Sequence, residues 1–160
     1  MLIDKLLELD PGKRAVASVR FSHAHDVLAD HFPGMPIVPG VLLTEAMGQT
    51  GGWLLASAFG FSRWPLLVMI ERAKFRHFVA PDEELRLTAD LRSARADTFE
   101  IDAEAHGSGR VVASARLAFH AFEFSLSDPN RDLFEAWARR VFRDIGGPLL
   151  LPNGAAPRGF

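Results

Sequence analysis

Alternating hydrophobic and polar positions predict strands over much of this chain. Near the start, Ala15, Ala17, Val19 and Phe21 occupy every second position, which is the period of a half-buried strand. Four longer alternating runs follow, at 66–78, 84–93, 98–106 and 110–124. Because only a few residues, rich in Pro, Gly and Asp, separate these runs, we expect them to pair as antiparallel neighbours.

Two segments have the spacing of helices. Residues 40–59 are apolar on almost every side and carry a single charge, Glu45, which predicts a buried central helix. Residues 129–145 are amphipathic and begin at the Ser-Asp-Pro-Asn sequence of 127–130, which is typical of a helix start. The apolar stripe of this second helix consists of Leu133, Phe134, Trp137, Val141, Phe142 and Ile145. Residues 1–12 are compatible with a short helix or a strand, closed by an Asp-Pro-Gly turn.

One long apolar helix followed by an alternating sheet predicts an α+β fold in which the sheet wraps the helix. We assign residues 1–126 to this domain and residues 127–160 to a C-terminal helical extension with an irregular tail. The apolar stripe of the extension needs a partner surface, because large exposed apolar patches are unfavourable in water. We therefore expect the extension to pack on the sheet or across a dimer.

Composition narrows the functional classes. The 160 residues suffice for one domain with a substantial core, and 48% hydrophobic with 24% charged residues is ordinary for a globular protein. A net charge of −2 gives no reason to expect nucleic acid or an anionic membrane as a partner. The sequence has no cysteine and no tyrosine, which excludes a thiol nucleophile, a thiolate metal site and a tyrosine acid. It also has no signal-peptide core and no apolar run of membrane-spanning length, so we expect a cytoplasmic protein.

A loop rich in proline and glycine precedes the predicted central helix and contains His31. The residues that restrict or relax its backbone are Pro33, Gly34, Pro36, Pro39 and Gly40. Such a loop has a strongly specified conformation, because proline fixes φ and glycine permits tight turns. A histidine on a rigid loop, facing Glu45 at the edge of an apolar helix, has the outline of an acid–base site.

Residues 31–49, HFPGMPIVPGVLLTEAMGQ, resemble the active-site stretch of the (3R)-3-hydroxyacyl-acyl carrier protein dehydratases of bacterial fatty acid synthesis. The pattern of that family is H-F-P-G-x-P-I/V-x-P-G-V-L, followed by E-A at the same distance. The similarity extends to LELDPGKR at 7–14 and to VMIERAKFRHFVAPDEELRL at 68–87, so it covers roughly residues 1–124. It implies the hot-dog fold and a hydro-lyase that produces trans-2-enoyl-acyl carrier protein for fatty acids or lipid A acyl chains. The resemblance implies no cofactor, and it implies that the substrate is carried on the phosphopantetheine arm of the carrier protein.

The resemblance also implies roles for single residues. His31 corresponds to the acid/base histidine and Glu45 to its partner, and the two meet across a homodimer that often assembles into a trimer of dimers. Glutamate at this position, rather than aspartate, favours a dehydratase without isomerase activity. The implied substrate-binding residues are Phe32, Pro39, Gln49 and Phe75. A basic band, which is either a docking surface for the acidic carrier protein or a solvated strand face, consists of Arg63, Arg72, Lys74 and Arg76.

The chemistry can also be argued from the residues themselves. Elimination of water from a 3-hydroxyacyl thioester needs a base at the α-carbon, an acid at the β-hydroxyl and donors for a developing enolate. The backbone N–H groups of Gly40 and Val41, at the start of the helix, suit the thioester oxygen because helix N-termini favour negative charge. We expect burial beside apolar neighbours to make Glu45 a better proton donor.

Other interpretations stay open at this point. A hot-dog thioesterase uses a carboxylate or water on the same scaffold, and a non-catalytic subunit would only bind the acyl carrier protein. Gln49 either orients Glu45 or the substrate, or it makes a hydrogen bond at the edge of the core. His23, His25 and Asp26 have the residue types of metal ligands, but no second cluster supports them, so we predict no metal site.

Overall fold

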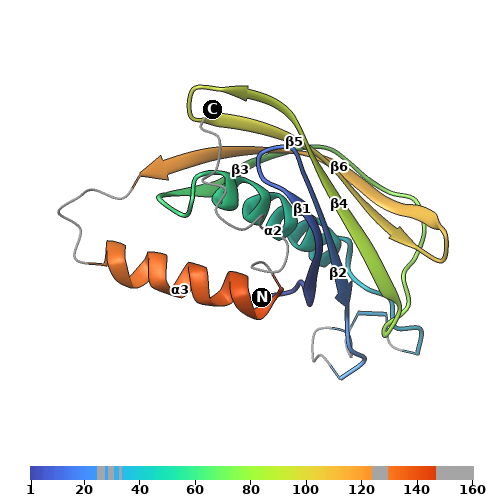
Figure 1. Cartoon of the computed structure of the whole chain (residues 1–160). Coiled ribbons are helices and arrows are strands. Elements are labelled where there is room, and N and C mark those ends of the chain that lie inside the picture. The colour runs from blue at the N-terminus through green and yellow to red at the C-terminus, as the bar shows by residue number, and fades with distance from the viewer. Residues whose placement is uncertain (25–27, 29–30, 33, 124–129, 147–160) are drawn as a thin grey trace.

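The structure is a computed structural model that describes residues 1–24, 28, 31–32, 34–123 and 130–146. Figure 1 shows a curved sheet that wraps one side of a long helix, with a second helix on the other side. The predicted α+β fold, in which an antiparallel sheet encloses a central helix, is confirmed. None of the helices in the described ranges has the length and apolar character that a membrane span requires.

Six strands within the described residues form one antiparallel sheet in the order β1-β2-β4-β5-β6-β3. They are β1 (Lys5–Asp10), β2 (Arg14–Arg20), β3 (Arg63–Phe75), β4 (Glu84–Arg95), β5 (Thr98–Gly107) and β6 (Arg110–Glu123). The predicted pairing of sequence neighbours holds for β4, β5 and β6 but is wrong for β3, which pairs with β6 instead of β4. The reason is that β2 already occupies that edge of β4, so β3 is displaced to the far side of the sheet.

The predicted boundaries differ most for β3. The strand starts at Arg63, where it pairs with Glu123 of β6, and it leaves the regular ladder after Phe75. The residues after Phe75 turn toward the loop before the central helix, because Val38 N donates a hydrogen bond to Val79 O at 2.9 Å. The helix predicted at 129–145 is α3 (Arg131–Asp144). Its predicted start at 127–129, the end of the last strand at 124 and the tail lie outside the described residues.

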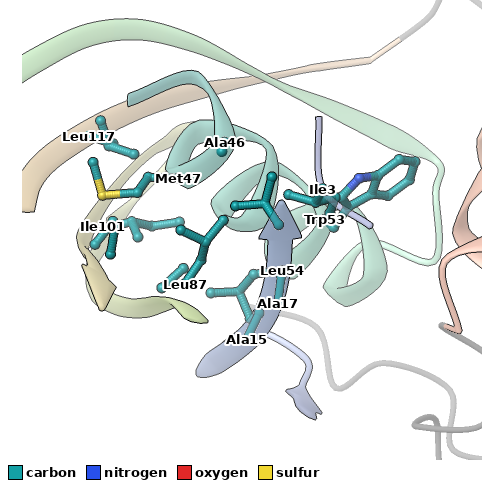
Figure 2. Close-up of a cluster of buried hydrophobic side chains, with 14 of the residues drawn as sticks. Ile3, Ala15, Ala17, Ala46, Met47, Trp53, Leu54, Leu87, Ile101 and Leu117 are labelled. Atoms are coloured by element: carbon teal, nitrogen blue, oxygen red, sulfur yellow. The ribbon is translucent and has the colours of Figure 1, made fainter. Parts of the chain in front are cut away.

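The central helix α2 (Gly40–Ala58) is buried along most of its length, as its apolar surroundings predict. Met47 and Leu54 are fully buried and pack against the inner side of the sheet, where Leu87, Ile101 and Leu117 are also fully buried (Figure 2). Burial of a leucine or methionine side chain contributes roughly 1.5–3 kcal/mol. This core holds the start of α2, and therefore Glu45, in a fixed position relative to the sheet.

Two adjacent glycines of α2 have different surroundings. A Cβ atom on Gly51 would lie 3.0 Å from Ile101 Cδ1 and 3.2 Å from Phe119 Cε2, both in the core. A Cβ atom on Gly52 would meet no atom within 4 Å. Gly51 therefore permits the helix to approach the sheet closely, whereas Gly52 leaves space beside the helix empty.

An aromatic cluster joins α3 to the rest of the chain. The ring of Phe142 lies 5.0 Å from that of Phe61 and 5.8 Å from that of Trp53, measured between centroids. Trp64 of β3 stands edge-on to Phe134 at 4.8 Å. Aromatic pairs at these separations add roughly 0.5–1.5 kcal/mol each beyond the area that they bury. Phe142 and Ile145 of the apolar stripe are buried within the same chain, whereas Leu133 and Trp137 stay exposed.

Two polar contacts fix the position of α3. At its C-terminal end, Ile145 O accepts a hydrogen bond from Leu6 N of β1 at 2.8 Å. In the middle of the helix, Arg139 donates to Gly60 O at 2.6 Å and lies 5.1 Å above the ring of Phe61. The predicted C-terminal extension thus shares the core of the residues that precede it, through Phe142 and Ile145 among others.

A charged cluster lies on the opposite face of β5 from the core. Asp102 accepts hydrogen bonds from Arg92 of β4 and Arg116 of β6, each at 3.1 Å. Partial burial alone would raise the pKa of Asp102, but the hydrogen bonds and positive charges of Arg116 and Arg92 outweigh it and hold this pKa below its ordinary value. The cluster ties the three strands together on their solvent side.

Candidate active site

His31 is half-buried at the start of the loop, and its Nδ1 atom lies 3.0 Å from the backbone oxygen of Ile37. A carbonyl oxygen can only accept a hydrogen bond, so Nδ1 carries the proton and Nε2 of the neutral ring keeps a lone pair. Within the described residues, the ring makes this bond through Nδ1 and none through Nε2. The loop therefore selects the tautomer in which Nε2 can take up a proton. Pro33 lies outside the described residues.

The neighbour of His31 has an unusual backbone conformation. Phe32 has a φ of 60°, a region that residues other than glycine adopt at a cost of about 1–3 kcal/mol. Its ring stands edge-on to the imidazole at 4.7 Å between centroids, and its carbonyl accepts a hydrogen bond from Met35 N at 3.0 Å. The predicted substrate-binding residue Phe32 is thus exposed and held beside the imidazole.

The start of α2 brings four of the predicted site residues together. Pro39 is the N-cap residue and has no capping side chain, so the N–H groups of Gly40 and Val41 lack an acceptor among the described residues. The ring of Phe75 covers Gly40 so closely that a Cβ atom there would lie 2.9 Å from Phe75 Cε1. Glycine is therefore required at this position if the ring is to stay in place. The result is a pair of free donors next to an exposed aromatic ring.

Glu45 has an exposed side chain and is held by a neighbour one turn further along α2. Gln49 Nε2 donates to Glu45 Oε1 at 3.0 Å, and Gln49 Oε1 accepts a hydrogen bond from Leu2 N at 2.8 Å. The second bond fixes which end of the amide faces the carboxylate, because a backbone N–H can only donate. These contacts agree with the interpretation in which Gln49 orients Glu45. The expected burial of Glu45 among apolar neighbours is wrong for the single chain.

A cavity of about 320 Å³ lies beside Glu45. Its lining residues include Glu45, Gln49, Gly48, Gly52, Trp64 and Trp137. His31 is not among the described residues that line it, and no hydrogen bond or ion pair within the described part of the chain joins His31 to Glu45. The two predicted catalytic groups are therefore not joined to each other within this chain.

The first member of the predicted basic band is engaged within the protein. Arg63 is mostly buried, forms an ion pair with Asp97 and donates to Ala121 O at 3.1 Å. Its Nε atom also lies 3.5 Å from an oxygen of Glu123. These contacts anchor the start of β3 to β6 and to the turn between β4 and β5.

The other three members lie near the far end of β3. Arg72 and Lys74 are exposed beside a bulge in the strand, and Arg76 is exposed and donates to Ser114 Oγ at 2.8 Å. At about 3.3 Å per residue, roughly 30 Å of strand separate Arg63 from Arg72. The predicted band is thus split, and its larger part flanks Phe75, next to the start of α2.

The described residues contain no group of three or more His, Cys, Asp or Glu side chains that could hold a metal ion. His23 takes part in a turn, where its backbone N–H donates to Asp82 Oδ1 at 3.1 Å. His25 and Asp26 lie outside the part of the chain that the structure describes.

A curved antiparallel sheet around a long central helix is the architecture of the hot-dog fold. The chain belongs to the ApeI-like dehydratase family, whose sequence model, described as ApeI dehydratase, matches residues 8–116. This match confirms the predicted dehydratase resemblance and the predicted enzyme class, a hydro-lyase.

Curated relatives bear the name 3-hydroxyacyl-acyl-carrier-protein dehydratase FabZ. The protein from Syntrophotalea carbinolica is 38% identical over 119 residues, which cover 73% of this chain and 81% of that protein. The protein from Symbiobacterium thermophilum is 36% identical over 132 residues, which cover 82% of this chain and 93% of that protein. The region of similarity includes the loop, α2 and the sheet, whereas the family model ends before α3.

Solved structures with the same fold are more distant in sequence. An uncharacterized protein from Pyrococcus horikoshii has a TM-score of 0.64 at 13% identity, covering 80% of this chain and 89% of that one. A conserved protein from Pseudomonas aeruginosa has a TM-score of 0.61 at 21% identity, covering 74% of this chain and 87% of that one. At such identities the likeness concerns the fold, and it confirms the hot-dog architecture.

Leu2 and Trp137 are among the contributors to the site that were not predicted from the sequence. The backbone N–H of Leu2 fixes Gln49, and no side-chain pattern reveals such a contact. Trp137 of α3 lines the cavity beside Glu45. Its place in an amphipathic stripe indicated that it would pack somewhere, but not that it would pack at the site.

Proposed function

We propose that the chain removes water from a (3R)-3-hydroxyacyl group on acyl carrier protein and forms the trans-2-enoyl product. The observation that carries this proposal is the hydrogen bond from His31 Nδ1 to Ile37 O, because it leaves Nε2 as a base on a fixed loop. The substrate class comes from the names of the relatives, which describe 3-hydroxyacyl-acyl-carrier-protein dehydratases. No cofactor takes part in the proposed reaction.

In this reaction, His31 Nε2 takes a proton from the α-carbon, and the electrons of that C–H bond form the double bond between the α- and β-carbons. The bond between the β-carbon and oxygen breaks with its electron pair passing to oxygen. Glu45 in its acid form donates a proton, so that the oxygen leaves as water. The N–H groups of Gly40 and Val41 stabilise the negative charge that develops on the thioester oxygen. Proton exchange with solvent then restores both side chains.

A second copy of the chain completes the site in this proposal. His31 and Glu45 are not hydrogen-bonded to each other in one chain, so a dimer in which each site takes one group from each copy accounts for both. The edge strand β3 exposes apolar side chains, including Val68 at 56% and Ile70 at 49%, and a partner strand would cover them. The proposed unit is therefore a homodimer, which can assemble further into a trimer of dimers.

The carrier protein docks, in this proposal, on Arg72, Lys74 and Arg76. These cations flank Phe75, whose ring covers the start of α2, so a carrier bound there would deliver its phosphopantetheine arm close to the free N–H groups. Attraction between exposed charges weakens with ionic strength, so activity on carrier-bound substrate should be more sensitive to salt than activity on a small thioester. Arg63 is left out of this surface because of its internal ion pairs.

The experiment that tests the proposed function mixes two inactive variants, His31→Ala and Glu45→Gln. Random pairing of equal amounts makes half of the dimers mixed, and each mixed dimer has one intact site and one site that lacks both groups, so about a quarter of the wild-type activity should return. Activity is measured as hydration of a short trans-2-enoyl thioester, and each variant mixed with itself serves as the control. Wild-type protein that forms no hydration product would refute the proposed activity, and a mixture as inactive as its components would refute the shared site.

A parallel assay for released thiol separates dehydration from thioester hydrolysis, the alternative that this scaffold allows. Thiol release by the wild type without any hydration product would assign the chain to thioesterases instead. Binding of acyl carrier protein without either product would assign it to non-catalytic subunits.

A further inference from the structure

The cavity beside Glu45 is built by two parts of the chain. One side is α2, where Glu45, Gly48 and Gly52 share a face because they are three, four and seven positions apart. The opposite side combines Trp64 and its neighbours on β3 with Trp137 of α3. The match to the family model ends at residue 116, so α3 lies in the part of the chain that this model does not cover.

The cavity has one polar end and one apolar end. Glu45 and Gln49 lie at the polar end. Trp53 is eight residues after Glu45 in α2, which places it roughly 12 Å from Glu45 along the helix axis at about 1.5 Å per residue. At the apolar end, Trp64 lies 5.6 Å from Trp53 and 6.1 Å from Trp137 between ring centroids. A volume of about 320 Å³ is at the lower end of the roughly 300–1,000 Å³ range of small-molecule pockets.

Glycine keeps this space open on the side of the helix. A Cβ atom on Gly52 would project into open space, and one on Gly48 would touch only Leu67 Cδ2 at 3.5 Å. Glycine weakens a helix relative to alanine, so its presence here is not explained by helix stability. Packing against a neighbour does not explain Gly52 either, because no atom lies within reach of its Cβ position.

The wall formed by α3 is fixed in place. The hydrogen bond from Leu6 N to Ile145 O holds one end of the helix, and the bond from Arg139 to Gly60 O holds its middle. Trp137 also contacts Phe134 at 5.5 Å between ring centroids. A wall anchored in this way limits the length of a ligand that enters from the Glu45 end.

We propose that this cavity takes the methyl end of the acyl chain, and that Trp137 on α3 sets the longest chain that fits. The proposal rests on the proposed function, since it assigns the substrate of that same site. The reacting carbons lie at Glu45, and the apolar tail runs along Gly48 and Gly52 toward the tryptophans. Trp137 is thus a specificity-determining residue that lies outside the catalytic region.

The test uses two substitutions with opposite expected effects. Trp137→Ala removes the wall and should raise kcat/KM for long trans-2-enoyl thioesters relative to a short one, by about tenfold for each methylene group newly accommodated. Gly52→Leu fills the floor and should lower the same ratio by at least as much. The full chain is assayed with a series of enoyl thioesters from short to long, and the measured quantity is the ratio of kcat/KM values between chain lengths.

Leu133→Ala is the matched control, because Leu133 is one turn before Trp137 on the same helix, is 70% exposed and does not line the cavity. Its chain-length profile should equal that of the wild type. General damage to the fold would lower the rates for all chain lengths alike, and circular dichroism melting identifies such damage. An unchanged profile in both Trp137→Ala and Gly52→Leu, or a shift of both in the same direction, would overturn the proposal. Wild-type protein that hydrates no thioester would instead refute the proposed function.

Discussion

Alanine substitution at the two adjacent glycines of α2 offers a sharp test of the packing between this helix and the sheet. In both variants the helix gains about 0.8–1 kcal/mol of intrinsic stability, because alanine is the better helix former. In Gly51→Ala the new methyl group would lie 3.0 Å from Ile101 Cδ1 and 3.2 Å from Phe119 Cε2. Both neighbours are enclosed, with Ile101 0% and Phe119 2% exposed, so neither can move aside freely. Overpacking of this kind costs about 1–3 kcal/mol.

The gain in helix propensity is common to both variants, so the difference between them isolates the packing cost. We expect Gly52→Ala to stabilise the protein by up to about 1 kcal/mol and Gly51→Ala to be less stable than it by about 1–3 kcal/mol. For a domain of this size, that difference corresponds to roughly 3–10 °C in melting temperature. Thermal melting followed by circular dichroism measures it, and urea unfolding at one temperature provides the free energies. Equal stability of the two variants would show that the sheet does not press on Gly51 as the distances indicate.

Two further outcomes follow from polar contacts of the described residues. Gln49→Leu removes the donor to Glu45 Oε1, so we expect kcat to fall on the order of tenfold. KM should stay nearly unchanged, because the carboxylate loses its orientation while the substrate keeps its pocket. An equal rise in KM would indicate a binding role instead. Asp102→Asn should destabilise the protein at neutral pH by less than about 1 kcal/mol, since the carboxylate is about half exposed. Because the folded-state pKa of Asp102 is lowered, its stabilising effect is present above the unfolded-state pKa and is lost as the pH falls through the folded value. Urea unfolding of both proteins should therefore give a difference at pH 7 that shrinks below about pH 4, and a difference that grows on acidification would contradict this reasoning.

Periodicity predicted most of the secondary structure because the pattern of burial repeats along each element. The alternation of Phe99, Ile101, Ala103 and Ala105 corresponds to the inward face of β5, and the nearly uniform apolar character of 40–59 corresponds to a helix enclosed by the sheet. The neighbours of β3 could not be predicted in this way. Periodicity reveals which face of a strand is buried, but the choice between the free edges of β4 and β6 depends on where β2 pairs.

The candidate site was predictable to the extent that it depends on side-chain type at fixed spacing. His31, Gly40 and Glu45 could be named from the motif. The hydrogen bond from His31 Nδ1 to Ile37 O depends on how the loop folds back, and the hydrogen bond from Leu2 N to Gln49 depends on where the start of the chain lies. Neither contact can be predicted from the residue types. The exposure of Glu45 was also missed, since apolar sequence neighbours on a helix do not cover a side chain that points away from them.

The hydrogen bond between Leu6 and Ile145 has a consequence for the order of events during synthesis. It joins β1 to the end of α3, which are separated by nearly the whole described chain, so it cannot form until α3 has left the ribosome. Until then, Trp53, Phe61 and Trp64 lack the side chains of α3 that cover them. A nascent chain with such aromatic surface uncovered is a natural client for chaperones that shield apolar segments. Ribosomal stalling between β6 and α3 would accordingly yield a species that aggregates, although its sheet and central helix have already been made.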